Sequence, residues 1–319
     1  MTYIIAEIGN NHNGNLKKCF ELFKSAAESG ASAVKIQSFT GKDIISPKVK
    51  SSLYPDWDSK GHEYWYKFLD SIALPLEDHQ AAIDYANELG IDFITTPVTP
   101  DIVDYLEKLN GIKGYKLASM DLNNIDLVQA LAKTNKSIII STGMSDLNEI
   151  ENVVSILKNN DLSILHCVSD YPLNPDDATL NNICVLKDNF DKFKVGFSDH
   201  SLGYELALIA ITLGAEIIEK HFTLNRNDKD SAEHHFSMEP KELKTLVEWS
   251  NTLEKNFNET SWQRSKKEQS SKMQVRRSFH YKKDLPKNHI IKREDLIFIR
   301  PGEGLNFDNI DQILNQKLT

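Results

Sequence analysis

Two histidines occupy matching positions near the ends of two short apolar segments. His200 follows Ser198 in SDH, and His221 follows Glu219 in EIIEKHF. Alternate side chains of a strand face the same side, so each histidine shares a face with the polar residue two positions before it. Two imidazoles with open positions for water and substrate could hold a divalent ion that acts as a Lewis acid on a carbonyl. The alternative is a hydrogen-bonded core histidine, the commoner role of a lone histidine at a strand end.

The spacing of these side chains does not identify the metal. Imidazole nitrogens alone favour zinc or another late transition metal, whereas carboxylates such as Glu7 and Glu219 also admit manganese or magnesium. His234 and His235 follow an acidic stretch and are interpreted as loop residues or as residues behind the ligands. His12, in GNNHNG, has two interpretations, because Asn and Gly there could simply form a turn.

Lysines interrupt two other apolar segments, Lys35 in AVKIQ and Lys116 in YKLAS. Strand alternation directs Lys35 and Gln37 to one face and Val34 and Ile36 to the other. A lysine inside an apolar strand is costly unless an anion compensates it. A phosphate or carboxylate ligand would supply that anion, and hydroxyls at other segment ends would assist: Thr95, Thr96, Ser119, Ser141 and Ser198. The alternative is that each lysine reaches solvent or a nearby carboxylate.

Eight short apolar segments position these residues. They span residues 3–9, 33–37, 92–96, 115–119, 137–142, 162–167, 194–199 and 216–222. Amphipathic segments separate them, such as NLKKCFELFKSAAESG, which ends at Gly30. Eight strand–helix units in about 250 residues predict an α/β fold, the (β/α)8 TIM barrel. The alternative is an open doubly wound sheet, but no G-x-G-x-x-G follows the first segment.

The pattern changes after the eighth unit. We expect the catalytic barrel to span residues 1–255. Residues 256–274 lose hydrophobic periodicity and gain Ser, Lys, Gln and Glu, which predicts a linker. Residues 275–319 contain short strand-like pieces between turn signals, which indicates a second, small module.

Composition narrows the class of protein. A net charge of -9 and a pI near 5.6 argue against nucleic-acid binding. Three cysteines, Cys19, Cys167 and Cys184, cannot all pair and have no metal-ligand spacing, which favours a reducing, cytoplasmic setting. No signal peptide and no 18-residue apolar run is visible, so neither export nor a membrane partner is expected.

The chain resembles the N-acetylneuraminate (sialic acid) synthase family, which includes legionaminic and pseudaminic acid synthases, over essentially its full length. The matching motifs occur in the family's order: AEIGNNHNG, AVKIQSF, FITTP, YKLAS, IISTGM, ILHCVSDYP, GFSDHSLG, IEKHFTL and finally RPGEG. The resemblance implies a TIM barrel followed by an antifreeze-like (SAF) domain. It also implies condensation of phosphoenolpyruvate with an N-acetylmannosamine-type sugar to form a nonulosonic acid and phosphate.

The resemblance also implies roles for individual residues. Phosphoenolpyruvate would be surrounded by Lys35, Thr96, Lys116, Ser119, Ser141, Ser169 and Ser198, with the lysines neutralising its phosphate and carboxylate. Glu7, Gln37, Tyr171 and Glu219 would position the sugar and move protons, so Glu7, Glu219 and Lys116 are the expected catalytic residues. Carbon 3 of phosphoenolpyruvate would attack the sugar aldehyde, and water would add at carbon 2 before phosphate leaves with C–O cleavage.

The implied cofactor is a divalent metal held by His200 and His221, which would polarise the aldehyde. Manganese is expected, with magnesium or cobalt as alternatives. Arg300, in RPGEG, would reach the sugar from the other subunit of a domain-swapped homodimer. Three positions depart from the family's usual pattern: Asp121 stands for a Glu, Glu233 for a sugar-contacting Asp, and Ser169 for an Asn. The chain ends at NQKLT, about where family members continue, which leaves open whether the small domain is complete.

Two other classes of protein stay open at this stage. A related barrel synthase for a phosphorylated aldose, or a Schiff-base aldolase that uses Lys116, would need the same barrel mouth. A non-enzymatic carbohydrate-binding or structural role of the C-terminal segment is the other alternative, but it leaves the strand-end lysines and histidines unexplained. The acceptor sugar does not follow from the sequence.

Overall fold

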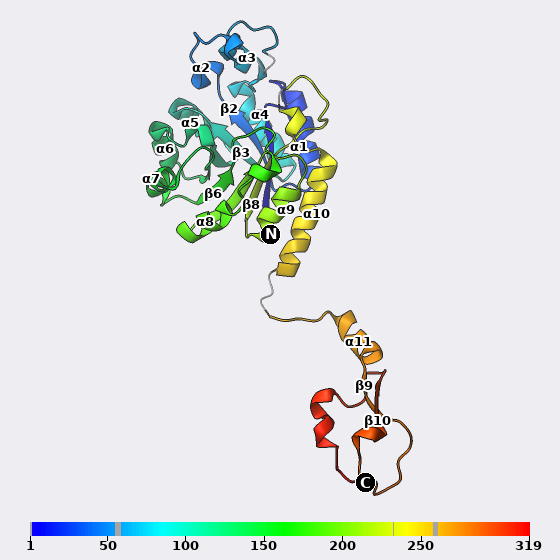
Figure 1. Ribbon diagram of the computed structural model, residues 1–319. Helices are drawn as coiled ribbons and strands as arrows, with labels where there is room; N and C mark the ends of the chain where they lie inside the picture. The colour runs from blue at the N-terminus through cyan, green and yellow to red at the C-terminus, as the bar shows by residue number, and fades with distance from the viewer. Residues whose placement is uncertain (1, 55–58, 232, 258–260) are drawn as a thin grey trace. The chain divides into compact units, whose positions relative to one another are not determined.

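Eight parallel strands form a closed barrel in chain order (Figure 1). In this computed structural model they are β1 (Tyr3–Gly9), β2 (Ala33–Ser38), β3 (Asp92–Pro97), β4 (Ile112–Leu117), β5 (Ser137–Ser141), β6 (Leu162–Cys167), β7 (Lys194–Asp199) and β8 (Ile217–His221). β8 closes the barrel by pairing with β1, which places His221 opposite Glu7. The predicted (β/α)8 barrel is therefore confirmed, and the open-sheet alternative is wrong.

One predicted strand is displaced. The fourth strand spans Ile112–Leu117 rather than residues 115–119, because Ser119–Asp121 form a helical turn. Gly111 and Gly114 lie near its beginning, and two glycines so close together are typical of a turn in a sequence. Gly114 is buried inside the strand, where a Cβ would collide with the backbone of Ser137 on β5.

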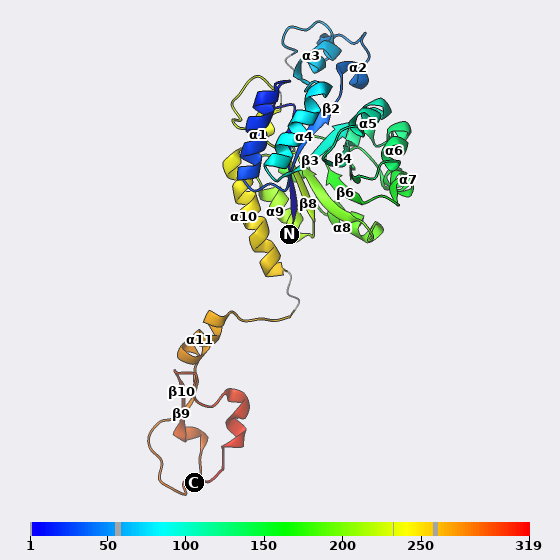
Figure 2. The ribbon, with the colours of Figure 1, turned by 180° about the vertical axis from the view of Figure 1, so that it is seen from behind.

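Helices cover the outside of the barrel, as the two views in Figures 1 and 2 show. They are α1 (Leu16–Glu28), α4 (His79–Glu88), α5 (Pro100–Leu106), α6 (Ile125–Ala132), α7 (Leu147–Leu157), α8 (Asn182–Asn189), α9 (Glu205–Thr212) and α10 (Pro240–Phe257), while α2 (Gly41–Ile44) and α3 (Trp65–Ile72) lie at one end of the barrel. Local signals define their ends: Asn15 caps α1, and Asp146 with Glu149 forms a capping box on α7. Val34 and Ile36 face these helices, as predicted.

A separate apolar layer fills the barrel interior. It consists of Ile5, Ala33, Ile94, Ile139, Leu165 and Ile217. Side chains two residues farther along a strand point the same way, so the next layer toward the carboxyl ends is set by parity. That layer is polar: Glu7, Lys35, Thr96, Ser141, Cys167 and Glu219. The fold therefore stacks a polar layer directly on an apolar floor.

The structure describes residues 2–54, 59–231, 233–257 and 261–319, and the chain divides into two units, 1–258 and 259–319. The second unit holds α11 (Lys266–Val275) and an antiparallel pair, β9 (Ser278–Tyr281) and β10 (Leu296–Ile299). The predicted linker, 256–274, thus includes the end of α10 and most of α11, while residues 258–260 lie outside the described residues. Ser265 caps α11, a signal that the loss of hydrophobic periodicity concealed.

A long connection between β2 and β3 carries α2 and α3 at the end of the barrel opposite the N-terminus (Figure 2). Trp65, Phe68 and Ile72 form its own apolar cluster. None of the helices in the described residues is long and apolar enough to cross a membrane.

Candidate active site

Two buried lysines and two buried carboxylates form a network at the carboxyl ends of the barrel strands. Lys35 Nζ lies 2.7 Å from Glu7 Oε2 and 3.7 Å from Glu219 Oε2. Lys116 Nζ lies 3.8 Å from Glu219 Oε1. All four side chains are at least nine-tenths buried. The carboxylates therefore supply part of the compensation that buried lysines require.

The two carboxylates differ in their acidity. Burial raises the pKa of Glu7 above its ordinary value, more than the charges of Lys35 and His221 lower it. Burial also acts to raise the pKa of Glu219, but Lys116 and Lys35 outweigh burial and lower this pKa to about 2. Two neighbouring carboxyl groups with pKa values pushed apart can serve as a proton carrier and a fixed negative charge, respectively.

The two lysines also differ. Burial acts to lower the pKa of Lys35, but Glu219 and Glu7 outweigh it and raise this pKa overall. Burial lowers the pKa of Lys116, and Glu219 only partly offsets that effect. Lys116 is therefore the less compensated cation, and an anionic ligand beside it would complete its environment.

Hydroxyl groups surround these lysines. The Thr96 hydroxyl accepts a hydrogen bond from Lys35 at 3.2 Å, and Ser198 donates to Glu219 at 3.0 Å. Ser119 accepts from the backbone N–H of Gly143 at 3.0 Å. A Cβ on Gly143 would collide with both Ser119 and Ser169, so glycine lets the loops after β4, β5 and β6 meet. The hydroxyls of Ser141 and Ser169 are buried and find no hydrogen-bond partner among the described residues.

The two histidines lie together on the other side of this network. The ring centroids of His200 and His221 are 5.6 Å apart. His200 Nδ1 lies 2.9 Å from the carbonyl oxygen of Val168, which leaves Nε2 available. The Tyr171 ring packs against His200 with centroids 4.1 Å apart, and Phe236 meets His221 edge-on at 4.9 Å. The fold thus brings both predicted metal ligands to one place and fixes their rings.

The residues predicted to contact the sugar come from several strand ends and loops of the barrel. Gln37 donates to Glu7 Oε1 at 3.4 Å, and Tyr171 is 43% exposed at the rim. Asp121 is half-buried after β4, and burial raises its pKa to about 6, although Asn124 opposes this. Glu233 lies on the connection between β8 and α10 and binds Asn10. Arg300 is exposed in the second unit.

Two residues of the site were missed in the sequence. Cys167 lies in the polar layer, where burial acts to raise the pKa of its thiol but His200 and Ser119 outweigh burial and lower this pKa. Asn10 donates its side-chain N–H groups to Gln37 and Glu233. Strand alternation could have indicated Cys167, because it lies two residues after Leu165, which faces the barrel interior, and therefore shares that face. No sequence signal distinguishes Asn10 from a turn residue.

The other histidines noted in the sequence have structural partners. His12 is fully buried and its Nδ1 accepts from the backbone N–H of Gly14 at 3.1 Å. His234 contacts Thr223 and Asp230. Asp228, Asp230 and His234 could together hold a metal, but Lys18 Nζ already lies 2.8 Å from Asp230 Oδ2. The Lys18 ammonium thus already neutralises part of the negative charge of this cluster. His235 is exposed beside this cluster.

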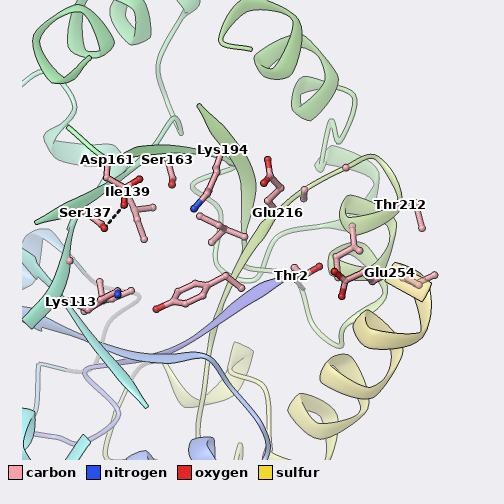
Figure 3. Close-up of a pocket in the computed structure, with 18 of the residues that line it drawn as sticks. Thr2, Lys113, Ser137, Ile139, Asp161, Ser163, Lys194, Thr212, Glu216 and Glu254 are labelled. Atoms are coloured by element: carbon pink, nitrogen blue, oxygen red, sulfur yellow. Dashed lines mark hydrogen bonds between the residues drawn. The ribbon is translucent and has the colours of Figure 1, made fainter. Parts of the chain in front are cut away.

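A cavity of about 800 Å³ opens at the opposite, amino end of the barrel (Figure 3). Its lining includes strand beginnings such as Tyr3, Lys113, Ser137 and Lys194, and the Ser137 hydroxyl donates to Asp161 across its wall. None of the predicted site residues lines it. Active sites of this fold lie at the carboxyl face instead, where loops from all eight strands converge.

The closed (β/α)8 barrel, with two buried lysines and a pair of histidines at the carboxyl ends of its strands, has the architecture of a TIM-barrel enzyme. The chain matches the NeuB family over residues 22–261 and belongs to that family. It is accordingly an enzyme of the sialic acid synthase type, a phosphoenolpyruvate-dependent transferase that forms carbon–carbon bonds.

Similar proteins support this assignment over most of the chain. The N,N'-diacetyllegionaminic acid synthase of Campylobacter jejuni is 37% identical over 323 residues, which cover 100% of this chain and 96% of the relative. A pseudaminic acid synthase of Campylobacter jejuni is 31% identical, with 99% of this chain and 92% of the relative covered. The crystal structure of an N-acetylneuraminic acid synthetase from Leptospira borgpetersenii, in complex with citrate, has a TM-score of 0.75 and 31% identity, covering 85% of this chain and 90% of that chain.

Proposed function

We propose that this protein condenses phosphoenolpyruvate with an N-acetylmannosamine-type amino sugar, releasing phosphate and a nonulosonic acid. The observation that carries the proposal is the pair of buried lysines, Lys35 and Lys116, beside the partnerless hydroxyls of Ser141 and Ser169. This arrangement suits a small, multiply charged anion. The names of the similar synthases supply the acceptor class, an amino sugar.

Phosphoenolpyruvate is held by the lysine side of the site. Lys116, the less compensated cation, pairs with one of its anionic groups, and Lys35 binds it while keeping Glu7 in place. The hydroxyls of Thr96, Ser119, Ser141 and Ser169 donate the remaining hydrogen bonds. Ser198, whose O–H donates to Glu219, holds that carboxylate beside the ligand. This geometry orients carbon 3 toward the histidine side, where the sugar aldehyde binds.

Proton transfer falls to the carboxyl groups. Glu7, whose pKa is raised by burial, carries a proton between solvent-derived water and the reacting oxygens. Glu219 stays ionised beside both lysines and stabilises the cationic character that develops at carbon 2. Water adds at carbon 2, a C–O bond breaks, and phosphate leaves with the bridging oxygen.

His200 and His221 would hold the divalent metal, for which manganese is the expected ion. Two features fit: the rings are close together, and Val168 engages the Nδ1 of His200 so that Nε2 remains for coordination. A bound metal would polarise the sugar aldehyde as a Lewis acid. Gln37, Asp121 and Tyr171 orient the sugar.

The second unit is proposed to be an antifreeze-like (SAF) domain that covers the barrel of the other subunit in a homodimer. Exposed apolar side chains on the segments after β4 to β7, including the first residues of α6 and α7, support a covered mouth: Met120, Ile125, Met144, Leu147, Tyr171 and Leu202. Arg300 then contacts the sugar. The free thiols of Cys19, Cys167 and Cys184 support a cytoplasmic location.

A sugar panel tests the proposed function. Phosphate release is measured with phosphoenolpyruvate, Mn²⁺ and, in turn, N-acetylmannosamine, a 2,4-diacetamido-6-deoxy sugar and a phosphorylated aldose. Release that requires an amino sugar and metal is expected, and label in the bridging oxygen of phosphoenolpyruvate should appear in phosphate. Release only with the phosphorylated aldose would indicate the related synthase.

The aldolase alternative can be tested at Lys116, because a lysine with a lowered pKa can form a Schiff base. Borohydride with pyruvate should leave the protein unmodified. A stable adduct on Lys116 would replace the proposed reaction by an aldolase.

A further inference from the structure

Both oxygens of the Glu233 carboxylate are bound by the protein itself. The backbone N–H of Asn10 donates to Oε2 at 2.9 Å, and the Asn10 side-chain amide donates to Oε1 at 3.2 Å. Glu233 also lies directly over Gly9, whose φ is +52° and where a Cβ would collide with Oε2. The loop after β1 thus forms a fitted cradle for this carboxylate.

The orientation of the Asn10 amide follows from its partners. Its nitrogen faces two acceptors, the carboxylate of Glu233 and the amide oxygen of Gln37. The Gln37 amide nitrogen in turn faces Glu7, which accepts. An unbroken series of hydrogen bonds therefore links the two carboxylates across the mouth, with each donor assigned by its neighbour.

Glu233 is also the group that faces the Nδ1 atom of His221, with 3.4 Å between Nδ1 and Oε2. That separation is long for a hydrogen bond, but His221 Nδ1 is buried and has no closer partner among the described residues. Phe236 and Tyr171 hold the ring edge-on, at centroid distances of 4.9 and 6.2 Å. A proton on Nδ1 would point at Glu233 and leave Nε2 unprotonated.

The connection that carries Glu233 is fastened at several points. Ser237 donates to the Glu233 carbonyl at 2.6 Å. The His234 ring bridges Thr223 and Asp230, at 2.7 and 2.8 Å. Asp230 is further paired with Lys18 of α1. These hydrogen bonds thus anchor the backbone of Glu233 and the side chain of its neighbour His234.

We propose that Glu233 is a positioning residue for His221: it accepts the Nδ1 proton, fixes the ring and makes Nε2 the stronger metal donor. This assignment rests on the proposed metal at His200 and His221, and it removes Glu233 from the sugar contacts that the resemblance implied. Carboxylate partners behind ligating histidines act in this way in metal sites generally. His200 has a neutral carbonyl in the same place, so the two ligands differ in donor strength.

Metal affinity tests the proposal without reference to turnover. Mn²⁺ binding to the full chain is measured by calorimetry and by loss of the free-ion EPR signal, for the wild type and Glu233→Gln. We expect binding to weaken about 10- to 100-fold, with KM for the sugar at saturating Mn²⁺ changing by less than about threefold. Asn10→Ala should weaken Mn²⁺ binding in the same direction and serves if Glu233→Gln does not fold. Glu239→Gln is the matched control, since Glu239 lies in the same connection but binds Arg226.

Unchanged Mn²⁺ affinity in both Glu233→Gln and Asn10→Ala, or a raised sugar KM alone, would overturn the positioning role and leave the proposed function intact. If His200→Ala and His221→Ala instead bind Mn²⁺ as tightly as the wild type, the proposed metal site is wrong. The positioning role of Glu233, which depends on that site, is then wrong as well.

Discussion

Lys35 and Glu7 form a buried ion pair at the centre of the barrel mouth, with 2.7 Å between Nζ and Oε2. The strands dictate this contact, because Lys35 is the register partner of Glu7 across β1 and β2. Lys35 also faces Glu219, so its charge is compensated before any substrate binds. The contacts of Lys116 Nζ are longer, 3.8 Å to Glu219 Oε1 and 3.4 Å to the Leu117 carbonyl oxygen, so Lys116 relies more on an anionic ligand than Lys35 does.

Replacing Lys35 should therefore cost stability. Lys35→Met leaves Glu7 and Glu219 without their shared cation, and breaking a buried pair costs about 3 to 5 kcal/mol. Urea unfolding of the variant would show the loss. The double variant Lys35→Met/Glu7→Gln should recover part of it, because the unpaired charge is gone. Equal stability of the single variant and the wild type would contradict the compensating role.

Replacing Lys116 should instead affect substrate binding. Lys116→Met removes one charge-assisted contact to the anion, so KM for phosphoenolpyruvate should rise about 10- to 100-fold while KM for the sugar changes little. Steady-state kinetics with each substrate varied would measure both. Lys113→Met is the control, since Lys113 is exposed at the amino end of the same strand. An unchanged requirement for phosphoenolpyruvate would count against the anion role.

Metal-dependent activity should depend on His200 and His221 and not on the cluster of Asp228, Asp230 and His234. His200→Ala and His221→Ala should each abolish metal-dependent turnover with the fold intact, because two protein ligands are few to begin with. Circular dichroism and activity after chelation and Mn²⁺ return would check this. Asp228→Asn should respond normally to Mn²⁺, since Lys18 already neutralises that cluster. Full activity of either histidine variant would remove it from the site.

Arg300 should act on the neighbouring subunit. Deleting residues 275–319 or changing Arg300→Ala should weaken sugar use. If Arg300 acts across a dimer, mixing Arg300→Ala and His221→Ala subunits should give about a quarter of the wild-type rate above the residual activity of the Arg300→Ala homodimers, because half of the dimers are hybrids with one intact site. Size-exclusion chromatography would confirm subunit exchange. Wild-type kinetics of Arg300→Ala would exclude the residue from the site.

His12 should make stability depend on pH. Burial lowers its pKa from 6.5 to about 4, against the opposing charge of Glu233. The unfolded chain therefore binds a proton that the folded chain refuses between these values, so stability is present above pH 6.5 and is lost as the pH falls toward 4. The loss should reach about 2 kcal/mol between pH 7.5 and 5.

Urea unfolding at several pH values would measure that loss. His12→Asn keeps an acceptor for the Gly14 N–H. Below pH 6.5 it should reduce the slope of the unfolding free energy against pH by an amount that corresponds to about one proton. Identical slopes for wild type and His12→Asn would show that His12 does not set this dependence.

Local patterns in the sequence were enough to predict the barrel and its inward-facing polar residues. Period-two alternation placed Lys35 and Gln37 opposite Val34 and Ile36, and eight apolar segments with amphipathic spacers predicted the strands. The fourth strand was misplaced because Gly114, a buried strand residue, looks like a turn in the sequence.

Partners that are distant in sequence could be decided only by the tertiary structure. That Glu219 lies between Lys35 and Lys116, that Cys167 touches His200, and that Asn10 binds Glu233 depend on barrel closure and loop packing. The physical reason is range: strand periodicity is a local backbone property, whereas a charge's partner, and hence its pKa, is set by whichever side chains the closed barrel brings within a few ångströms. The residue types in this chain indicated a metal and an anion, and the fold determined which carboxylate stays ionised and which histidine receives a carboxylate partner.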